Sequence, residues 1–249
     1  MSLKERPVKT TAYSDTLVQL TRLPRVFPVN CYLVREDDGL TLIDTTIGGS
    51  TKSILAAARK MGAPIVRIAL THAHGDHVGS LDDLHAALPA AEILVPAREA
   101  RFLSGDLTLE ADETQGKLRG GWKACTTQPT RLLEPGDRVG SLEVVAAPGH
   151  TPGHVAFLDT RDRSLIAGDA LQTRAGIAVS GVVRPLFPFP AMATWHKPTA
   201  LASVRALRRL EPGLLAVGHG AMLPQPLTAM DRAIATCERQ VEEMAAHAS

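Results

Sequence analysis

The sequence predicts an α/β protein in which two similar halves form one sandwich. Strand-like and helix-like segments alternate along the chain, and the order of strands followed by helices occurs twice. The chain has 249 residues, 45% of them hydrophobic, which is enough to bury a large core without disulfides. We therefore expect a single domain over residues 1–249.

The first half is expected to open with antiparallel strands. Strand-like runs occur at residues 16–21, 30–35 and 40–44, and an Asp-Asp-Gly turn signal separates the last two. Apolar residues at helical spacing, followed by Gly62, predict a helix over residues 50–61. The rest of this half should comprise a buried strand over 65–70, a helix over 81–88, a strand over 92–95 and a short helix over 97–103.

A polar segment separates the two halves. Periodicity fades over residues 105–130, which is long for a featureless loop, and we expect a flap or a partly helical insertion there. The second half again begins with strands: a hairpin over 138–147 that turns at Gly140-Ser141, then strands over 154–158 and 164–167.

An apolar segment rich in proline follows. Pro188 and Pro190 exclude a continuous helix over residues 176–198, so we expect an irregular wall whose part over 182–195 either lines a substrate pocket or closes the sandwich. Beyond it we predict a helix over 198–210, a strand over 214–217 and a last helix over 227–244. The apolar spacing of the last helix favours docking on its own domain, with a homodimer seam as the alternative.

Charge and cysteine content exclude several classes of protein. Lys and Arg number 27 against 26 Asp and Glu, so the net charge is +1, and no nucleic-acid-binding or membrane-binding surface is expected. The chain starts with a charged segment, without a signal peptide or a membrane span, so we expect a cytoplasmic protein with a small-molecule substrate. The three cysteines lack the spacing of a disulfide framework or a cysteine zinc site, and we expect reduced, packed thiols.

A cluster of histidines points to a metal site. His72 and His74 lie two residues apart after a predicted strand, and Gly75 lets the chain turn so that Asp76 and His77 face a neighbouring position. Three further candidates each follow a predicted strand beside a glycine: His150, Asp169 and His219. A His/Asp set without thiolates suits Zn(II), Mn(II) or Fe(II), and the pattern alone does not choose among these metals.

These motifs resemble the metallo-β-lactamase superfamily. The resemblance spans nearly the whole chain, from Leu-Ile-Asp-Thr at 42–45 through the His-x-His-x-Asp-His segment to Gly-His-Gly at 218–220. It implies an αββα sandwich of two mixed β-sheets flanked by helices, with two divalent metal ions at one edge, most simply Zn(II). Carried over by position, the first ion is held by His72, His74 and His150, the second by Asp76, His77 and His219, and Asp169 bridges both.

The same resemblance implies a reaction class. We expect a binuclear metal-dependent hydrolase that attacks a lactone, ester or thioester carbonyl with a metal-bridging hydroxide; Asp169 bridges the ions, and Asp76 is both a ligand and the proton acceptor for the leaving group. The zinc β-lactamases of antibiotic resistance commonly have Cys where this chain has Asp169, which favours the lactonase and glyoxalase II branches. The alternatives are a mononuclear non-haem iron enzyme resembling persulfide dioxygenases, with His72, His150 and Asp169 as ligands, and a glyoxalase II-like thioesterase.

Three residues near these motifs are assigned other roles. Asp44 either orients a ligand histidine or caps a loop. His154 has ligand-like spacing, but in the family pattern the earlier histidine of Pro-Gly-His-Thr-Pro-Gly-His binds metal, so we expect His154 to support the site or belong to a strand. His196 follows the apolar wall and is a candidate pocket-lining residue.

Overall fold

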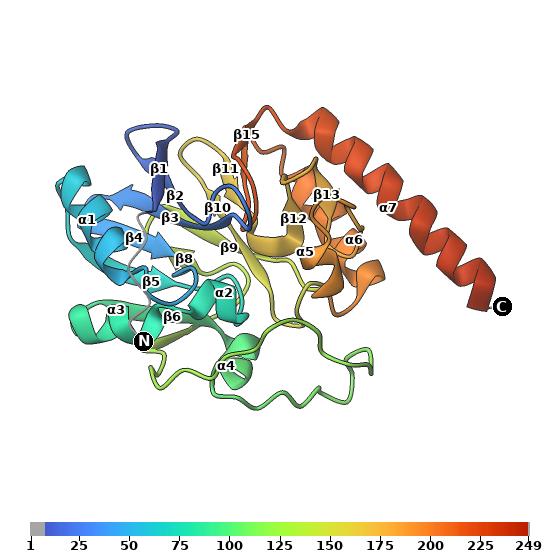
Figure 1. Cartoon of the computed structure of the whole chain (residues 1–249), viewed down its shortest axis with the longest axis horizontal. Coiled ribbons are helices and arrows are strands. Elements are labelled where there is room, and N and C mark those ends of the chain that lie inside the picture. Colours follow the sequence, from blue (N-terminus) through green and yellow to red (C-terminus); the bar gives the residue numbers. More distant parts are fainter. Residues whose placement is uncertain (1–7, 249) are drawn as a thin grey trace.

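The computed structural model describes residues 8–248 and shows two β-sheets packed face to face, with helices on both outer sides (Figure 1). The first sheet has the order β1-β2-β3-β4-β5-β6-β7. Neighbours are antiparallel from β1 to β4 and parallel from β4 to β7. Its strands are β1 Lys9–Ala12, β2 Leu17–Arg22, β3 Val29–Glu36, β4 Gly39–Ile43, β5 Ile65–Ala69, β6 Glu92–Pro96 and β7 Arg131–Leu133.

The second sheet has the order β15-β14-β11-β10-β9-β8, and β12 pairs with β13 in a separate ribbon. Only the β11–β14 pair of this sheet is parallel. The strands are β8 Arg138–Val139, β9 Leu142–Ala146, β10 Val155–Asp159, β11 Ser164–Ile166, β12 Leu171–Gln172, β13 Ala178–Val179, β14 Leu214–Ala216 and β15 Leu223–Pro224.

Strand alternation divides the interior into three apolar layers. In β3, Leu33 packs toward the helices while its neighbour Tyr32 packs between the sheets. In β10, Leu158 faces the helices of the second sheet and Phe157 faces the first sheet. A central layer therefore joins two sheets that are each covered by their own helices, which gives the αββα order.

Each sheet has its own helices. On the first sheet these are α1 Thr51–Met61, α2 Gly75–Val78, α3 Leu81–Ala87 and α4 Ala97–Leu103; on the second they are α5 Phe189–Met192, α6 Lys197–Arg209 and α7 Leu227–Ala248, with a short 3-10 turn at Gly168–Ala170. The first part of α7 packs on its own domain through Met230, Ile234 and Cys237, while its C-terminal end extends beyond the sheets (Figure 1).

Most predicted elements are present, with a few corrections. Residues 104–130 form turns and extended chain without the helical part that the sequence allowed. The apolar wall contains one helical turn, α5, which tolerates proline because Pro190 lies at its start. The prediction lacked the strands β1, β7, β12, β13 and β15, and it had a turn at Gly75 where the structure has the short helix α2. All three cysteines are free and buried, as expected. Among the described residues, no helix combines the length and apolarity of a membrane span.

Candidate metal centre

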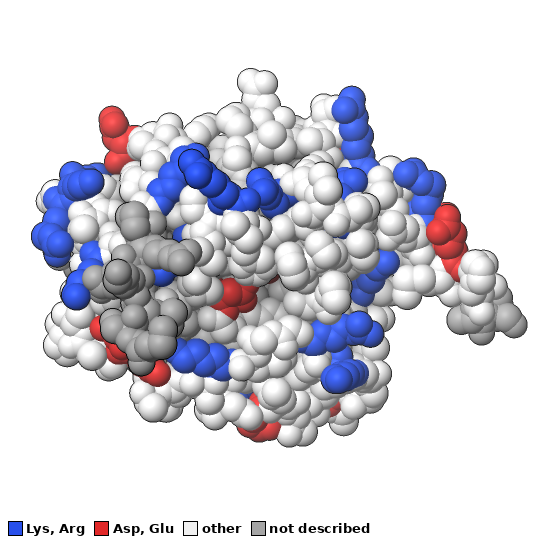
Figure 2. Space-filling model, in the orientation of Figure 1, with Lys and Arg blue, Asp and Glu red and all other residues white. Residues whose placement is uncertain are grey.

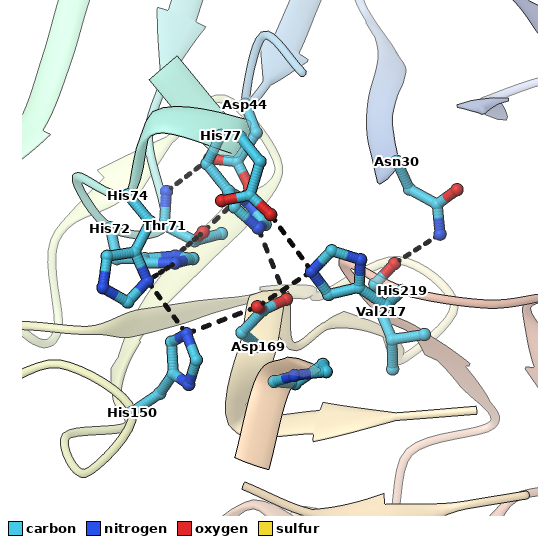
Figure 3. Close-up of polar contacts among 12 residues, drawn as sticks. Asn30, Asp44, Thr71, His72, His74, His77, His150, Asp169, Val217 and His219 are labelled. Carbon is cyan, nitrogen blue, oxygen red and sulfur yellow. Dashed lines mark hydrogen bonds and ion pairs between the residues drawn. The ribbon is translucent and has the colours of Figure 1, made fainter. Parts of the chain in front are cut away.

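The seven residues singled out by their spacing lie together at one edge of the sandwich. All of them except Asp76 are labelled in Figure 3. His72 and His74 follow β5, Asp76 and His77 lie on α2, and Asp169 lies on the turn after β11. His150 and His219 follow β9 and β14, so both sheets contribute. Their ligand atoms form three groups, each within 4.8 Å: His72, His74, His150; His72, His77, Asp169; and Asp76, His77, His219.

The first group is a set of three converging imidazole nitrogens. His74 Nδ1 lies 3.2 Å from His72 Nε2 and 3.0 Å from His150 Nε2. All three side chains are buried. One histidine thus presents Nδ1 and the other two present Nε2 to a common point.

The outward nitrogens of these rings fix which nitrogen carries the proton. The Arg119 carbonyl can only accept, so His74 Nε2–H donates to it, at 3.0 Å. His72 Nδ1 donates to Thr71 Oγ1, because the Thr71 hydroxyl itself donates to the Asp44 carboxylate. The same logic applies to His150 Nδ1, which donates to Ser180 Oγ at 2.9 Å, since that hydroxyl donates to the Asp169 carbonyl.

Each neutral ring therefore directs a lone pair into the cluster. Three lone pairs about 3 Å apart repel one another unless a cation lies among them. A metal-binding histidine also usually donates the N–H of its other ring nitrogen to a hydrogen-bond acceptor, as these three do. Burial lowers the pKa of His72, His74 and His150, which favours the neutral form that binds metal.

In the second group, which comprises Asp76, His77 and His219, the outward ring nitrogens of the histidines also donate to acceptors. His77 Nδ1 donates to Asp44 Oδ2 at 2.8 Å, and His219 Nδ1 donates to the Pro28 carbonyl at 2.7 Å. Both Nε2 atoms therefore face inward, where His219 Nε2 lies 3.4 Å from Asp76 Oδ2. Asp76 completes this set at the side that faces solvent, since a quarter of its side chain (25%) is exposed.

Asp169 lies between the two groups. Its Oδ2 is 3.3 Å from His150 Nε2 and 3.1 Å from His219 Nε2, while its Oδ1 is 3.4 Å from His77 Nε2. Among the described residues, His77 Nε2 and Asp169 Oδ1 are buried and lack a hydrogen-bond partner. Orphaned buried polar atoms are rare, and divalent cations would satisfy both, so the residues present fit a metal centre.

The electrostatics of the second group also favour positive charge. Burial opposes protonation of His77, but the carboxylates of Asp169 and Asp44 outweigh it and raise the pKa of that imidazole. Burial is likewise outweighed at His219, where Asp169 and Asp76 raise the pKa to about 10. A metal ion on the same nitrogens would supply the positive charge that these carboxylates attract.

Supporting residues hold the ligands in place. Asp44 orients His77, and it also accepts the Thr71 backbone N–H at 2.8 Å, so the orienting role expected from the sequence is the one observed. His154 lies outside the three ligand groups, and its Nε2 accepts the Asp169 backbone N–H at 3.0 Å. His196 was a candidate pocket residue, but it precedes α6, bonds Thr199 and does not line the cavity at the cluster.

Glu99 is a site residue that the sequence did not reveal. Its carboxylate is fully buried on α4 and accepts three hydrogen bonds, from Ala73 N, Thr151 Oγ1 and Gly153 N, at 2.7 to 2.8 Å. These donors belong to the loops that carry His74 and His150. In the sequence Glu99 lies in an Ala-Arg-Glu-Ala-Arg stretch that is typical of an exposed helix face, so no local signal marks it.

A cavity of about 540 Å³ opens onto the cluster. The ligands His74, Asp76, His150, Asp169 and His219 form its floor, and its apolar walls come from Phe27, Trp122, Phe189 and Met192. The apolar segment 182–195 thus has two roles, because Phe187 and Val182 are buried while Phe189 and Met192 line the cavity. Among the described residues, Lys123 is the only Lys or Arg that lines this cavity, and its ammonium donates to the Gly79 carbonyl at 2.8 Å.

Comparison with known proteins agrees with this architecture. A family model described as the metallo-beta-lactamase superfamily matches residues 24–219. The chain belongs to the metallo-β-lactamase superfamily. The fold expectation is confirmed by the crystal structure of the DIM-1 metallo-β-lactamase, which covers 95% of this chain and 99% of that one with a TM-score of 0.72 at 14% identity.

Two curated relatives from Bacillus subtilis (strain 168) resemble this superfamily member. The uncharacterized protein YobT is 49% identical over 228 residues, which cover 91% of this chain and 97% of YobT. The probable metallo-hydrolase YflN is 28% identical over 77% of this chain and 80% of its own length. The expectation of an enzyme of the metal-dependent hydrolase class is confirmed at the level of the superfamily.

Proposed function

We propose that the protein is a binuclear metal-dependent hydrolase that cleaves a lactone, ester or thioester. The observation that carries the proposal is that Asp169 Oδ2 contacts a histidine of each ligand group, His150 Nε2 at 3.3 Å and His219 Nε2 at 3.1 Å. A mononuclear iron enzyme would need only His72, His150 and Asp169. The additional presence of Asp76, His77 and His219 in one group supports two ions over one.

Asp169 and Asp76 have different roles in the proposed reaction. Divalent cations held here supply the ionisation of water near neutral pH and the polarisation of a substrate carbonyl. Asp169 joins the two ligand groups, because its Oδ1 faces His77 and its Oδ2 faces both His150 and His219. Asp76 faces the cavity and is partly exposed, so its carboxylate is placed to accept the proton that the leaving group requires.

Zn(II) is the metal we propose first, with Mn(II) and Fe(II) as alternatives. Imidazole and carboxylate ligands without thiolates suit all three. The structure of TTHA1623, which is 27% identical over 85% of this chain with a TM-score of 0.62, is a di-iron-bound form. That relative supports iron as the second choice.

The cavity walls favour a small substrate with an apolar group. Phe27, Phe189 and Met192 lie beside the ligand floor, and apolar walls with a few convergent polar groups are typical of small-molecule sites. Lys and Arg side chains on the face shown in Figure 2 lie in separate groups rather than in one basic patch, which gives no support to a nucleic-acid substrate.

A glyoxalase II-like thioesterase is the alternative within the hydrolase class. The hydroxyacylglutathione hydrolase of Rhodopseudomonas palustris (strain HaA2) is 29% identical over 140 residues, which cover 52% of this chain and 46% of that enzyme. The shared part contains less than half of that enzyme. A thioester of glutathione therefore belongs in the substrate panel beside lactones and simple esters.

The test compares the metal-loaded protein with an Asp169→Ala variant on such a panel. We expect hydrolysis of at least one carbonyl class by the loaded protein, and loss of both metal content and turnover in the variant. Asp38→Ala, at an exposed position in the turn between β3 and β4, serves as the matched control. An Asp169→Ala protein that keeps two ions and full turnover would contradict the proposed role of Asp169.

A further inference from the structure

Residues 119–123, at the end of the polar insertion, run alongside the loop that carries the first ligands. The Gly75 backbone N–H donates to the Gly121 carbonyl at 2.7 Å, and His74 forms an isolated β-bridge with Trp122. The Trp122 ring packs on the His74 ring with a centroid distance of 4.5 Å. This segment therefore packs directly against the loop that carries His74.

One atom of the segment, the Arg119 carbonyl oxygen, determines which ring nitrogen of His74 carries the proton. The Arg119 carbonyl accepts His74 Nε2–H, and this contact leaves Nδ1 as the lone pair directed toward His72 and His150. If Arg119 moved away, the imidazole proton could shift to Nδ1 and block the first ligand group. A backbone carbonyl of the insertion thus controls a ligand's tautomer.

Gly120 is required for this approach. Its φ is +94°, and a Cβ atom at this position would lie 2.3 Å from His74 Nε2. That distance is a steric clash with the ring, so any other residue would displace either the imidazole or the Arg119 carbonyl. The glycine therefore permits the insertion to contact His74 directly.

The rest of the insertion is held by ion pairs to α4 and by hydrogen bonds to α3 and α4. Arg98 bonds Glu113 at 2.6 Å, and Arg101, whose side chain is 42% exposed, bonds Asp106 at 2.7 Å. The Arg98–Glu113 pair is largely buried, whereas the Arg101–Asp106 pair is exposed and holds its segment weakly. Among the described contacts of the insertion, those of residues 119–123 are the ones that reach the ligand histidine His74.

We propose that the insertion supports the metal centre. Docking of residues 119–123 stabilises metal binding at His72, His74 and His150, and metal binding in turn stabilises the docked segment. The inference rests on the metal centre proposed above. If His74 Nδ1 held a metal ion, the His74 Nε2–H would be a stronger donor to the Arg119 carbonyl, and by linkage the docked carbonyl would favour metal binding.

Three alanine variants test the steric part of this proposal. Gly120→Ala should lower the affinity for one of the two ions by roughly 10- to 100-fold, the usual effect of losing a partner of a ligand histidine. Gly136→Ala has the same φ of +94° in open space and controls for backbone strain, while Gly116→Ala, also in open space, controls for a change within the insertion. Affinities are measured by competition with a chromogenic chelator.

The outcomes separate this inference from the proposed function. A wild-type protein that takes up no ions would overturn the metal centre and the inference with it. A wild-type protein that binds two ions, together with an unchanged Gly120→Ala variant, would overturn the inference alone.

Limited trypsin digestion of the wild-type protein is a second test that needs no variant. Lys117 and Arg119 are exposed, and cleavage after Arg119 attacks the carbonyl that His74 engages. Cleavage there should be at least about tenfold faster in chelator-treated protein and slow again on adding Zn(II), with sites elsewhere in the chain unaffected. Equal rates with and without metal would contradict the proposed coupling.

Discussion

Glu99 Oε2 accepts the backbone N–H of Ala73 at 2.8 Å, midway between His72 and His74. Its other oxygen accepts Thr151 Oγ1 and Gly153 N, just beyond His150. One buried carboxylate therefore joins the two loops that supply the first ligand group. Because these loops come from different sheets, Glu99 couples the ligand geometry to the packing between the halves of the molecule.

Replacing Glu99 with Gln should weaken metal binding at the first group. If the amide oxygen keeps the Thr151 and Gly153 donors, the amide NH2 must face the Ala73 N–H, and two donors then oppose each other. We expect roughly a 10- to 100-fold loss of affinity for one ion, measured by chelator competition. Glu92→Gln, at an exposed position on β6, is the control; equal affinities in the two variants would exclude a positioning role.

The same pair of proteins has a predicted pH dependence. Burial, opposed by the three donors and Arg98, raises the pKa of Glu99 from 4.5 to about 7. As pH rises through this window the unfolded chain loses the proton first, so the wild type loses stability relative to Glu99→Gln, by up to about 3 kcal/mol. Denaturant unfolding of both metal-free proteins at several pH values measures this difference, and a difference that is constant with pH would refute it.

Asp44→Asn should affect the second ligand group. Asp44 has φ of +60°, which Asn tolerates, so the backbone is preserved. If the new amide oxygen keeps the Thr71 backbone N–H, the amide NH2 replaces the oxygen that accepts from both the Thr71 hydroxyl and His77 Nδ1, and the His77 proton shifts to Nε2, where it blocks the ligand position. We predict that metal stoichiometry falls toward one ion per chain at limiting metal; retention of two tightly held ions would show that Asp44 does not set the tautomer.

Phe189→Ala should alter substrate binding and leave the fold intact. The Phe189 side chain is 51% exposed and lines the cavity, so its removal costs apolar contact with the substrate rather than core packing. For esters with long acyl chains we expect KM to rise roughly tenfold with kcat little changed. Leu186→Ala, at a position 88% exposed outside the cavity, is the control. An effect independent of chain length would contradict an apolar subsite.

The sequence predicted the parts of the molecule whose signal is local. The ligand candidates stand beside glycines at strand ends, and alternating or helical spacing marks the long elements, so both could be placed from the pattern alone. The strand β1 was missed because Lys9–Ala12 is polar and lies at a sheet edge, where pairing with β2 rather than burial makes it a strand.

The supporting contacts could not be predicted because their cause lies in tertiary structure. Glu99 is 26 residues from Ala73 and 52 from Thr151, and only the packing of α4 brings its carboxylate to both. The Arg119 carbonyl is a backbone atom, which leaves no side-chain signal in a sequence. The adjacent glycines 120 and 121 were visible, but the contact with His74 that requires Gly120 appears only in three dimensions.

Elemental analysis of the purified, untreated protein decides whether the seven ligand residues hold a binuclear metal centre. We expect close to two divalent metal ions per chain, most simply zinc, with manganese or iron as the other candidates. A single iron per chain would contradict a binuclear hydrolase and favour oxygen chemistry. Protein that contains no metal and takes up none when zinc, manganese or iron is added would contradict the metal centre itself.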